Sequence, residues 1–195
     1  MRTFSLSRVI KTGTIGLALV GMGLMAGHSA FAQNADVSSA PQKSGDIRAG
    51  VLFPLNSTIN NNVGKTVPLG GVDFVLKHDG ADQNTIISGE YQQRDSHGYQ
   101  LRIIPITIGQ VAYSGQSTSG FRPYFGYGVG AYLVQSTLPD SNGFSVSNNS
   151  TAFGGYLGLG LDITNEIFVD ARYQAVTKVG PATPSGIEVS AGFRF

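Results

Sequence analysis

Asp95, Ser96 and His97 stand side by side in the sequence, and together they supply a carboxylate, a hydroxyl and an imidazole. Those three groups perform nucleophilic acyl transfer when a histidine activates the serine and the carboxylate orients the histidine. The chemistry requires a hydrogen bond from base to nucleophile and a third group that holds the base. Three consecutive residues in a short loop rarely reach that geometry. We therefore expect a solvated loop here and no catalytic residue.

The remaining candidate sites are weaker. His78 precedes Asp79 at the end of an apolar segment and is interpreted as an interfacial or turn residue. No histidine or carboxylate pair has the spacing of metal ligands. The glycines of Gly126–Gly130 form a GxGxG pattern but no helix follows, so a nucleotide site is not expected. We predict neither a metal nor a cofactor.

The segments that would carry these residues alternate apolar and polar side chains, which is typical of β-strands. No helical pattern of comparable length follows the N-terminal segment. The predicted fold is an all-β, eight-stranded antiparallel up-and-down barrel. Its strands are expected at 46–55, 67–78, 85–94, 99–113, 121–134, 151–163, 166–177 and 186–195.

Connections of unequal length separate these strands. Asn56–Thr66 and Gln135–Ser150 are long and polar, whereas Thr164 and Asn165 form a tight turn. Outer-membrane barrels pair long extracellular loops with short periplasmic turns. Two connections fit this scheme less well, because Asp95–Gly98 is short for an outer loop and Ser114–Gly120 is long for an inner turn.

The first 32 residues have the three parts of a secretory signal peptide. Basic residues precede an apolar run at 14–27, and Ala30 and Ala32 occupy the −3 and −1 positions of a cleavage site. The alternative is an uncleaved anchor, for which the run is short, since a spanning helix needs about 20 residues. We expect cleavage after Ala32, a flexible periplasmic lead-in at 33–44 and a barrel at 45–195.

Composition excludes several classes of protein. The sequence has no Cys, which rules out disulfides and cysteine-ligated metals. Cleavage would remove three of the 13 Lys and Arg residues and leave ten against 12 Asp and Glu. A nearly neutral chain offers no electrostatic case for nucleic acid. With no later apolar helix, membrane residence would require a closed barrel of strands.

The charged residues of the strands fall on the face opposite the apolar stripe. In the last strand, for example, Glu188 and Arg194 oppose Val189 and Phe193. A lipocalin-like soluble barrel would place the apolar face inside, and parity alone leaves both orientations open. The signal peptide and an aromatic girdle near the strand ends favour the apolar face outside. The outward aromatic candidates are Phe53, Tyr99, Phe121, Phe125, Tyr127, Tyr173 and Phe195.

An interior of eight strands is wide enough only for side chains. Charges taken out of water must be paired, so we predict a structural ion-pair network in the lumen. Inward glycines such as Gly128 and Gly158 leave room for arginines and for Tyr124, Tyr132 and Tyr156. A continuous open pore is not expected. The predicted network consists of Asp46, Arg48, Asp73, Lys77, Glu90, Arg94, Arg102, Arg122, Asp162, Asp170, Arg172, Glu188 and Arg194.

Three stretches resemble the small outer-membrane β-barrels of Gram-negative bacteria, of the OmpA transmembrane domain, OmpX and OmpW types. They are Arg102–Gly109 (RIIPITIG), Phe121–Tyr132 (FRPYFGYGVGAY) and the terminal Gly192–Phe195 (GFRF). The resemblance implies an outer-membrane location, contact with outer-membrane lipids and lipopolysaccharide, and a monomer. It also implies that Phe193 and Phe195 form the C-terminal signal read by the barrel-assembly machinery.

Three functions remain open at this point. The first is a non-catalytic outer-membrane protein that contributes to envelope integrity or to surface interaction through its extracellular loops. The second is an OmpW-like, porin-like narrow conduit for small or apolar molecules. The third is a lipid-modifying enzyme, since some small outer-membrane barrels have that activity. A filled lumen and the absence of a triad geometry favour the first.

Overall fold

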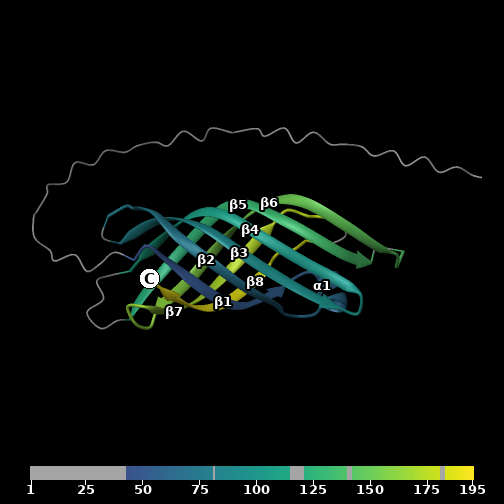
Figure 1. The fold of residues 1–195 in the computed structure, drawn as a ribbon, viewed down its shortest axis with the longest axis horizontal. Coiled ribbons are helices and arrows are strands. Elements are labelled where there is room, and N and C mark those ends of the chain that lie inside the picture. Colours follow the sequence, from purple (N-terminus) through teal and green to yellow (C-terminus); the bar gives the residue numbers. More distant parts are fainter. Residues whose placement is uncertain (1–42, 81, 115–120, 140–141, 181–182) are drawn as a thin grey trace, which may run out of the picture. The chain divides into compact units, whose positions relative to one another are not determined.

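The computed structural model describes residues 43–80, 82–114, 121–139, 142–180 and 183–195. In them, eight antiparallel strands close into a barrel in which each strand pairs with the next and β8 pairs with β1 (Figure 1). The predicted eight-stranded up-and-down barrel is confirmed. The strands are β1 (Gly45–Pro54), β2 (Val67–His78), β3 (Gln83–Ser96), β4 (Tyr99–Tyr113), β5 (Arg122–Pro139), β6 (Ser145–Asp162), β7 (Ile167–Val176) and β8 (Gly186–Arg194).

Some expectations fall on other parts of the chain. The signal segment with Ala30 and Ala32, almost all of the lead-in, and most of the connection Ser114–Gly120 lie outside the described residues. They stay predictions.

Both long connections contain regular structure that sequence reasoning assigned to loops. The expected loop Gln135–Ser150 is largely a continuation of β5 and β6, which pair from Arg122 and Asp162 out to Pro139 and Ser145. Its Ser, Thr and Asn residues lack the apolar alternation by which the other strands were predicted, and this is why the sequence assigned it to a loop.

The other connection, Asn56–Thr66, holds a short helix, α1 (Ser57–Asn62). The Asn56 side chain accepts hydrogen bonds from the backbone N–H groups of Thr58 and Ile59, which caps the helix N-terminus. Ile59 and Val63 are completely buried. Among the described residues, no helix has the length and apolar character needed to span a membrane.

The two ends of the barrel differ in their connections. At one end, called here the terminal end, the backbone N–H of Ser44 donates to the Phe195 carbonyl over 2.7 Å. The opposite, loop end carries α1, the β5–β6 hairpin and the turn of His97 and Gly98, both with positive φ. Figure 1 shows α1 at the end away from the C-terminus. Long connections and strand extensions on one side match the extracellular end of such barrels.

Large apolar side chains cover the outer wall. The orientation with the apolar face outside is therefore correct, and the soluble lipocalin-like alternative is wrong. One aromatic expectation also fails, because Tyr99 points inward and packs against the interior apolar cluster. Exposed residues of the wall include Ile47, Phe53, Phe74, Ile87, Ile106, Ile108, Phe125, Tyr127, Val129, Leu157, Leu159, Ile167, Tyr173, Val189, Phe193 and Phe195.

Candidate functional site in the interior and at the outer rim

The middle of the lumen is built around Arg48 of β1. Its Nη1 lies 2.5 Å from the Asp73 carboxylate of β2, and its Nη2 lies 3.0 Å from the Glu90 carboxylate of β3. Gly71 is paired with Arg48 in the register of β1 and β2. Its lack of a side chain leaves room for the Glu90 side chain, since a Cβ at Gly71 would lie 3.1 Å from Glu90 Cγ. All three charged residues are buried, so each offsets the desolvation of another.

Arg172 of β7 extends this network across the barrel. It contacts Asp170 over 2.7 Å and Asp73 over 3.3 Å, and its guanidinium lies 5.0 Å from the ring centre of Tyr156. Gly158 on β6 is required beside it, because a Cβ there would lie 2.9 Å from Arg172 Cγ. The inward glycines therefore provide the volume that buried arginines occupy.

The carboxylates of Glu90 and Glu188 share one neutral donor, Gln92, which sequence reasoning missed. The Gln92 side-chain amide donates to Glu90 and, over 2.9 Å, to Glu188. Gln92 itself has no exposed surface. Its inward position follows from the period of β3, so parity alone could have placed it in the lumen.

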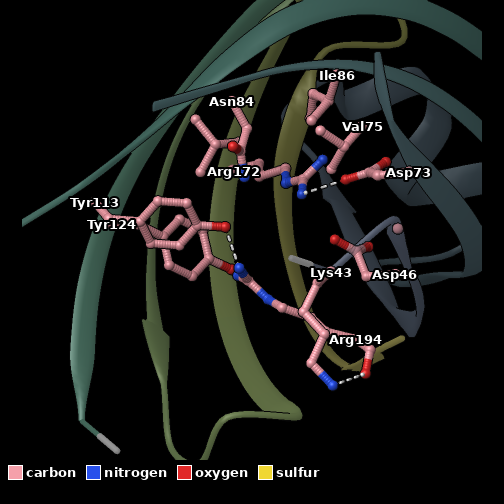
Figure 2. A pocket seen from close by; sticks show the side chains of 12 residues that line it. Lys43, Asp46, Asp73, Val75, Asn84, Ile86, Tyr113, Tyr124, Arg172 and Arg194 are labelled. Carbon is pink, nitrogen blue, oxygen red and sulfur yellow. Dashed lines mark hydrogen bonds and ion pairs between the residues drawn. The ribbon is translucent and has the colours of Figure 1, made fainter. Parts of the chain in front are cut away.

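Arg194 of β8 organises the terminal end of the lumen. Its guanidinium lies 4.9 Å from the ring centres of Tyr124 and Phe168, pairs with Asp162 over 2.8 Å and donates to the Tyr113 hydroxyl. Figure 2 shows Arg194 reaching toward Tyr113 and Tyr124. These three residues line a cavity of about 30 Å³.

That cavity has room for about two water molecules. Asp46 lines it and lies 3.9 Å from Arg48. The Tyr124 hydroxyl and one oxygen each of Asp46 and Asp73 are buried there without a protein hydrogen-bond partner. A second cavity of about 20 Å³, between Arg48, Tyr132 and Glu188, has room for about one water.

The loop-side half of the interior is apolar. Ile59 and Val63 of the α1 region pack in it with inward residues of the strands, including Leu138 from the extended part of β5. Ile59 and Val63 are four residues apart, which places them on one face of a helix, and they follow a capping asparagine, Asn56. This combination is the sequence signal that could have located the helix. The rest of the cluster comprises Leu52, Val67, Leu69, Leu101, Ile103, Tyr132, Val134, Ala152, Val176 and Val179.

Lys77 and Arg94, both predicted in the lumen network, are not part of it. The register of β2 against β3 shifts between Val75 and Lys77, and this bulge turns Lys77 outward, with its side chain 73% exposed. Its hydrogen bond to Asp79 lowers the pKa of that carboxyl below its ordinary value. Arg94 does point inward, but its guanidinium donates to the backbone carbonyl and the hydroxyl of Thr66, which follows α1 in the sequence, rather than to a carboxylate.

Arg122 and Arg102 complete the predicted set. Arg122 lies at the terminal mouth, 3.1 Å from Asp82 and 4.0 Å from the ring centre of Tyr113. Arg102 was predicted inward and is outward. The inward positions of β4 here are Leu101 and Ile103, both buried in the loop-side apolar cluster, which leaves the outer wall for the charge.

Outward-facing polar side chains surround Arg102. Its Nε donates to Gln93 over 3.2 Å, its Nη1 donates to Gln135 over 3.1 Å, and its guanidinium lies 5.9 Å from the Tyr91 ring centre. We call Tyr91, Gln93, Arg102 and Gln135 the rim patch. Sequence reasoning missed it by assuming that every strand charge faces the lumen.

The Asp95–Ser96–His97 segment does not form a triad. Ser96 Oγ lies 2.8 Å from His97 Nδ1, but the Asp95 carboxylate accepts a hydrogen bond from Gln93 over 3.1 Å instead of one from the imidazole. His97 sits in an exposed two-residue turn with a φ of 51°. The residues that the structure describes also contain no group of three potential metal ligands.

Comparisons with known proteins agree with this architecture. A family described as "Outer membrane protein beta-barrel domain" matches residues 18–195. No match to this chain was found among curated proteins. At the identities of the solved structures below, the likeness concerns the fold alone.

Three solved barrels illustrate that likeness. Ail, the attachment invasion locus protein of Yersinia pestis, in complex with the heparin analogue sucrose octasulfate, is 17% identical, with a TM-score of 0.50 over 79% of this chain and 100% of Ail. Neisserial surface protein A is 17% identical, with a TM-score of 0.51 over 77% and 95% of the two chains. The N-terminal barrel of Pseudomonas aeruginosa OprF is 16% identical, with a TM-score of 0.52 over 79% and 98%. Because the family match spans nearly the whole sequence and eight strands close with their apolar side outward, the chain belongs to the outer-membrane β-barrel family of Gram-negative bacteria.

Proposed function

We propose that this protein is a non-catalytic outer-membrane barrel that acts through its extracellular surface, in envelope integrity or in surface interaction. The observation that carries the proposal is the filled interior. Ion pairs around Arg48 and Arg172 occupy the middle of the lumen, and the apolar cluster under α1 closes the loop end. The cavities around this network measure about 30 and 20 Å³, which is space for a few waters and not for a solute.

Planar-bilayer recording tests this proposal against the alternative of a conduit. The purified barrel is expected to give no ion-conductance steps, because an ion would have to displace paired charges and then the apolar cluster. A variant with Ile59→Asp and Val63→Asp, which puts charge into the apolar cluster, serves as the matched comparison. Steady conductance by the unaltered protein would overturn the proposal.

The β5–β6 hairpin is the best candidate for the interacting surface. Its strands run past the apolar wall, and Phe144 near its tip is 72% exposed. A deletion strain can be complemented either with the full chain or with one whose residues 137–147 are replaced by a two-residue turn. If the hairpin carries the function, the shortened protein restores the outer-membrane amount of barrel but not the envelope phenotype. Full rescue by the shortened protein would assign the role to the barrel itself.

A lipid-modifying activity is the remaining alternative. It would need Ser96 or another nucleophile held against a base, and Asp95 is engaged by Gln93 instead of by His97. We expect identical lipid A mass spectra from the deletion strain complemented with wild-type protein or with Ser96→Ala. A modified lipid A species that depends on Ser96 would contradict the non-catalytic assignment.

Export through a cleaved signal peptide belongs to the same proposal. The basic residues, the apolar run and the alanines at 30 and 32 support cleavage before Gln33. N-terminal sequencing of protein taken from outer membranes tests it, and recovery of an intact Met1 would count against it.

A further inference from the structure

The rim patch lies where the outer wall changes from apolar to polar. On β4 the outward residues run Ile108, Ile106, Ile104 and then Arg102 toward the loop end. In the register, Arg102 stands between Gln93 of β3 and Gln135 of β5, and Gln135 stands beside Asn149 of β6. Four neighbouring strands, β3 to β6, therefore present a row of three amides and one guanidinium. This row lies on the loop side of the apolar surface that faces lipid tails.

Among the described residues, the guanidinium in this row has no carboxylate partner. The buried arginines Arg48, Arg172 and Arg194 each contact at least one carboxylate. Arg102 is held instead by the neutral side-chain oxygens of Gln93 and Gln135, through Nε and Nη1. Within the described part of the chain, no contact of Nη2 is recorded. The two amides thus hold the guanidinium through Nε and Nη1 and do not engage Nη2.

An anion with several oxygens fits such a group. Guanidinium binds phosphate through parallel N–H···O hydrogen bonds, and a neutral amide shell orients it without neutralising its charge. Tyr91 lies one step toward the apolar wall, with its ring centre 5.9 Å from the guanidinium, and its hydroxyl donates to Gln93. A tyrosine at that depth is typical of a membrane interface.

The position of the patch selects the source of the phosphate. It lies at the border of the apolar wall toward the loop end, which the connection lengths assign to the extracellular side. In the sequence, the strand ends and connections on this side contain Lys65, Arg94, Arg102 and Lys178 against Asp95 and Asp140. We propose that the rim patch binds a lipid A phosphate of lipopolysaccharide in the outer leaflet, with Arg102 as the anion ligand. This site goes beyond the proposed function, which does not require it.

Native mass spectrometry of the folded barrel in neutral detergent, titrated with diphosphorylated lipid A, tests the proposal. Arg102→Gln should weaken binding roughly tenfold, since it removes charge-assisted hydrogen bonds. Lys65→Gln is the matched control, because it removes an exposed cation of the same end away from the wall, and it should bind as wild type does. Asp95→Asn should tighten binding about twofold, because Gln93 holds that carboxylate near the patch.

Two lipid controls identify the ligand. Dephosphorylated lipid A should bind wild-type protein as weakly as Arg102→Gln binds the diphosphorylated form, and phosphatidylglycerol should not substitute. Circular dichroism and heat-dependent gel mobility establish that each variant is folded. The proposal is overturned if folded Arg102→Gln retains wild-type affinity, if Lys65→Gln loses as much, or if phosphatidylglycerol binds Arg102 equally well.

Discussion

On strands β3 to β5, the barrel sorts its side chains toward the loop end in the opposite way from the rest of the barrel. From the terminal end to the middle, charges such as Arg48 and Arg172 lie inside, and apolar residues such as Val189 lie outside. Toward the loop end, Leu101 and Ile103 lie inside, and Gln93 and Arg102 lie outside. The first arrangement is that of a membrane barrel and the second is that of a soluble one.

The difference shows that the surrounding medium, and not the barrel fold, decides which face is apolar. Lipid accepts apolar side chains and rejects charge, so charge in the first half is internal and paired. Water beyond the bilayer accepts the polar face, which frees the interior to become an ordinary apolar core closed by α1. Along β4, the outward side chains change from apolar to charged within a few residues, between Ile104 and Arg102.

The largest effect is expected from breaking the ionic half. Arg172→Leu removes the cation that pairs with Asp170 and contacts Asp73, and leaves buried carboxylates without it. We expect a loss of about 3–5 kcal/mol in the free energy of unfolding. Urea titration of the barrel folded in lipid vesicles measures it. Lys65→Ala, an exposed loop change, should stay within about 0.5 kcal/mol. Equal midpoints for the two variants would contradict the comparison.

The outer wall gives the next largest contrast. Val189→Arg puts charge on the lipid-facing side near the middle of β8 and should cost about 2–4 kcal/mol, whereas the same change at Asn149, in the row of the rim patch, should cost about 0–1 kcal/mol. Both residues are exposed, so burial does not distinguish them. Denaturant titrations in the same vesicles compare the pair. If Asn149→Arg costs as much as Val189→Arg, the polar row lies inside the bilayer.

The apolar half should respond more weakly. Ile59→Ala removes buried methyl groups from the cluster under α1, and we expect a loss of about 2 kcal/mol, at the low end for such changes because the loop end can partly collapse. Combined with Arg172→Leu, the losses should add within about 0.5 kcal/mol, because the two sites share no contact. Strong coupling between them would show that the halves are not independent.

The smallest effect is expected at Lys77. The β2 bulge turns it outward, so Lys77→Met removes only an exposed ion pair and should lower the urea midpoint slightly at neutral pH, far less than a change in the lumen network. The pKa of Asp79 should rise toward its ordinary value, since its hydrogen bond to Lys77 is lost. A lowered carboxyl pKa contributes stability above the unfolded-state pKa and loses it as the pH falls through the folded one. NMR titration of Asp79 reads the change directly.

The sequence determined the number of strands, most of their bounds and the faces of β1, β7 and β8. In those strands every second residue is apolar across the membrane, and parity relates each residue to one of two sides. The same periodicity placed Asp46, Asp162, Asp170 and Glu188 on the inward face without any knowledge of their partners.

Tertiary structure alone decided the rest. The alternation of inward and outward residues is read along a single strand of the sequence. A bulge in the pairing of β2 with β3 moves Lys77 to the outer side, and the sequence of β2 does not reveal that bulge. The segment around Arg102 is apolar on both of its faces, through Leu101 and Ile103 on one and Ile104 and Ile106 on the other. Its orientation therefore depends on α1, which is distant in sequence and fills the interior with Ile59 and Val63, so that the charge must lie outside.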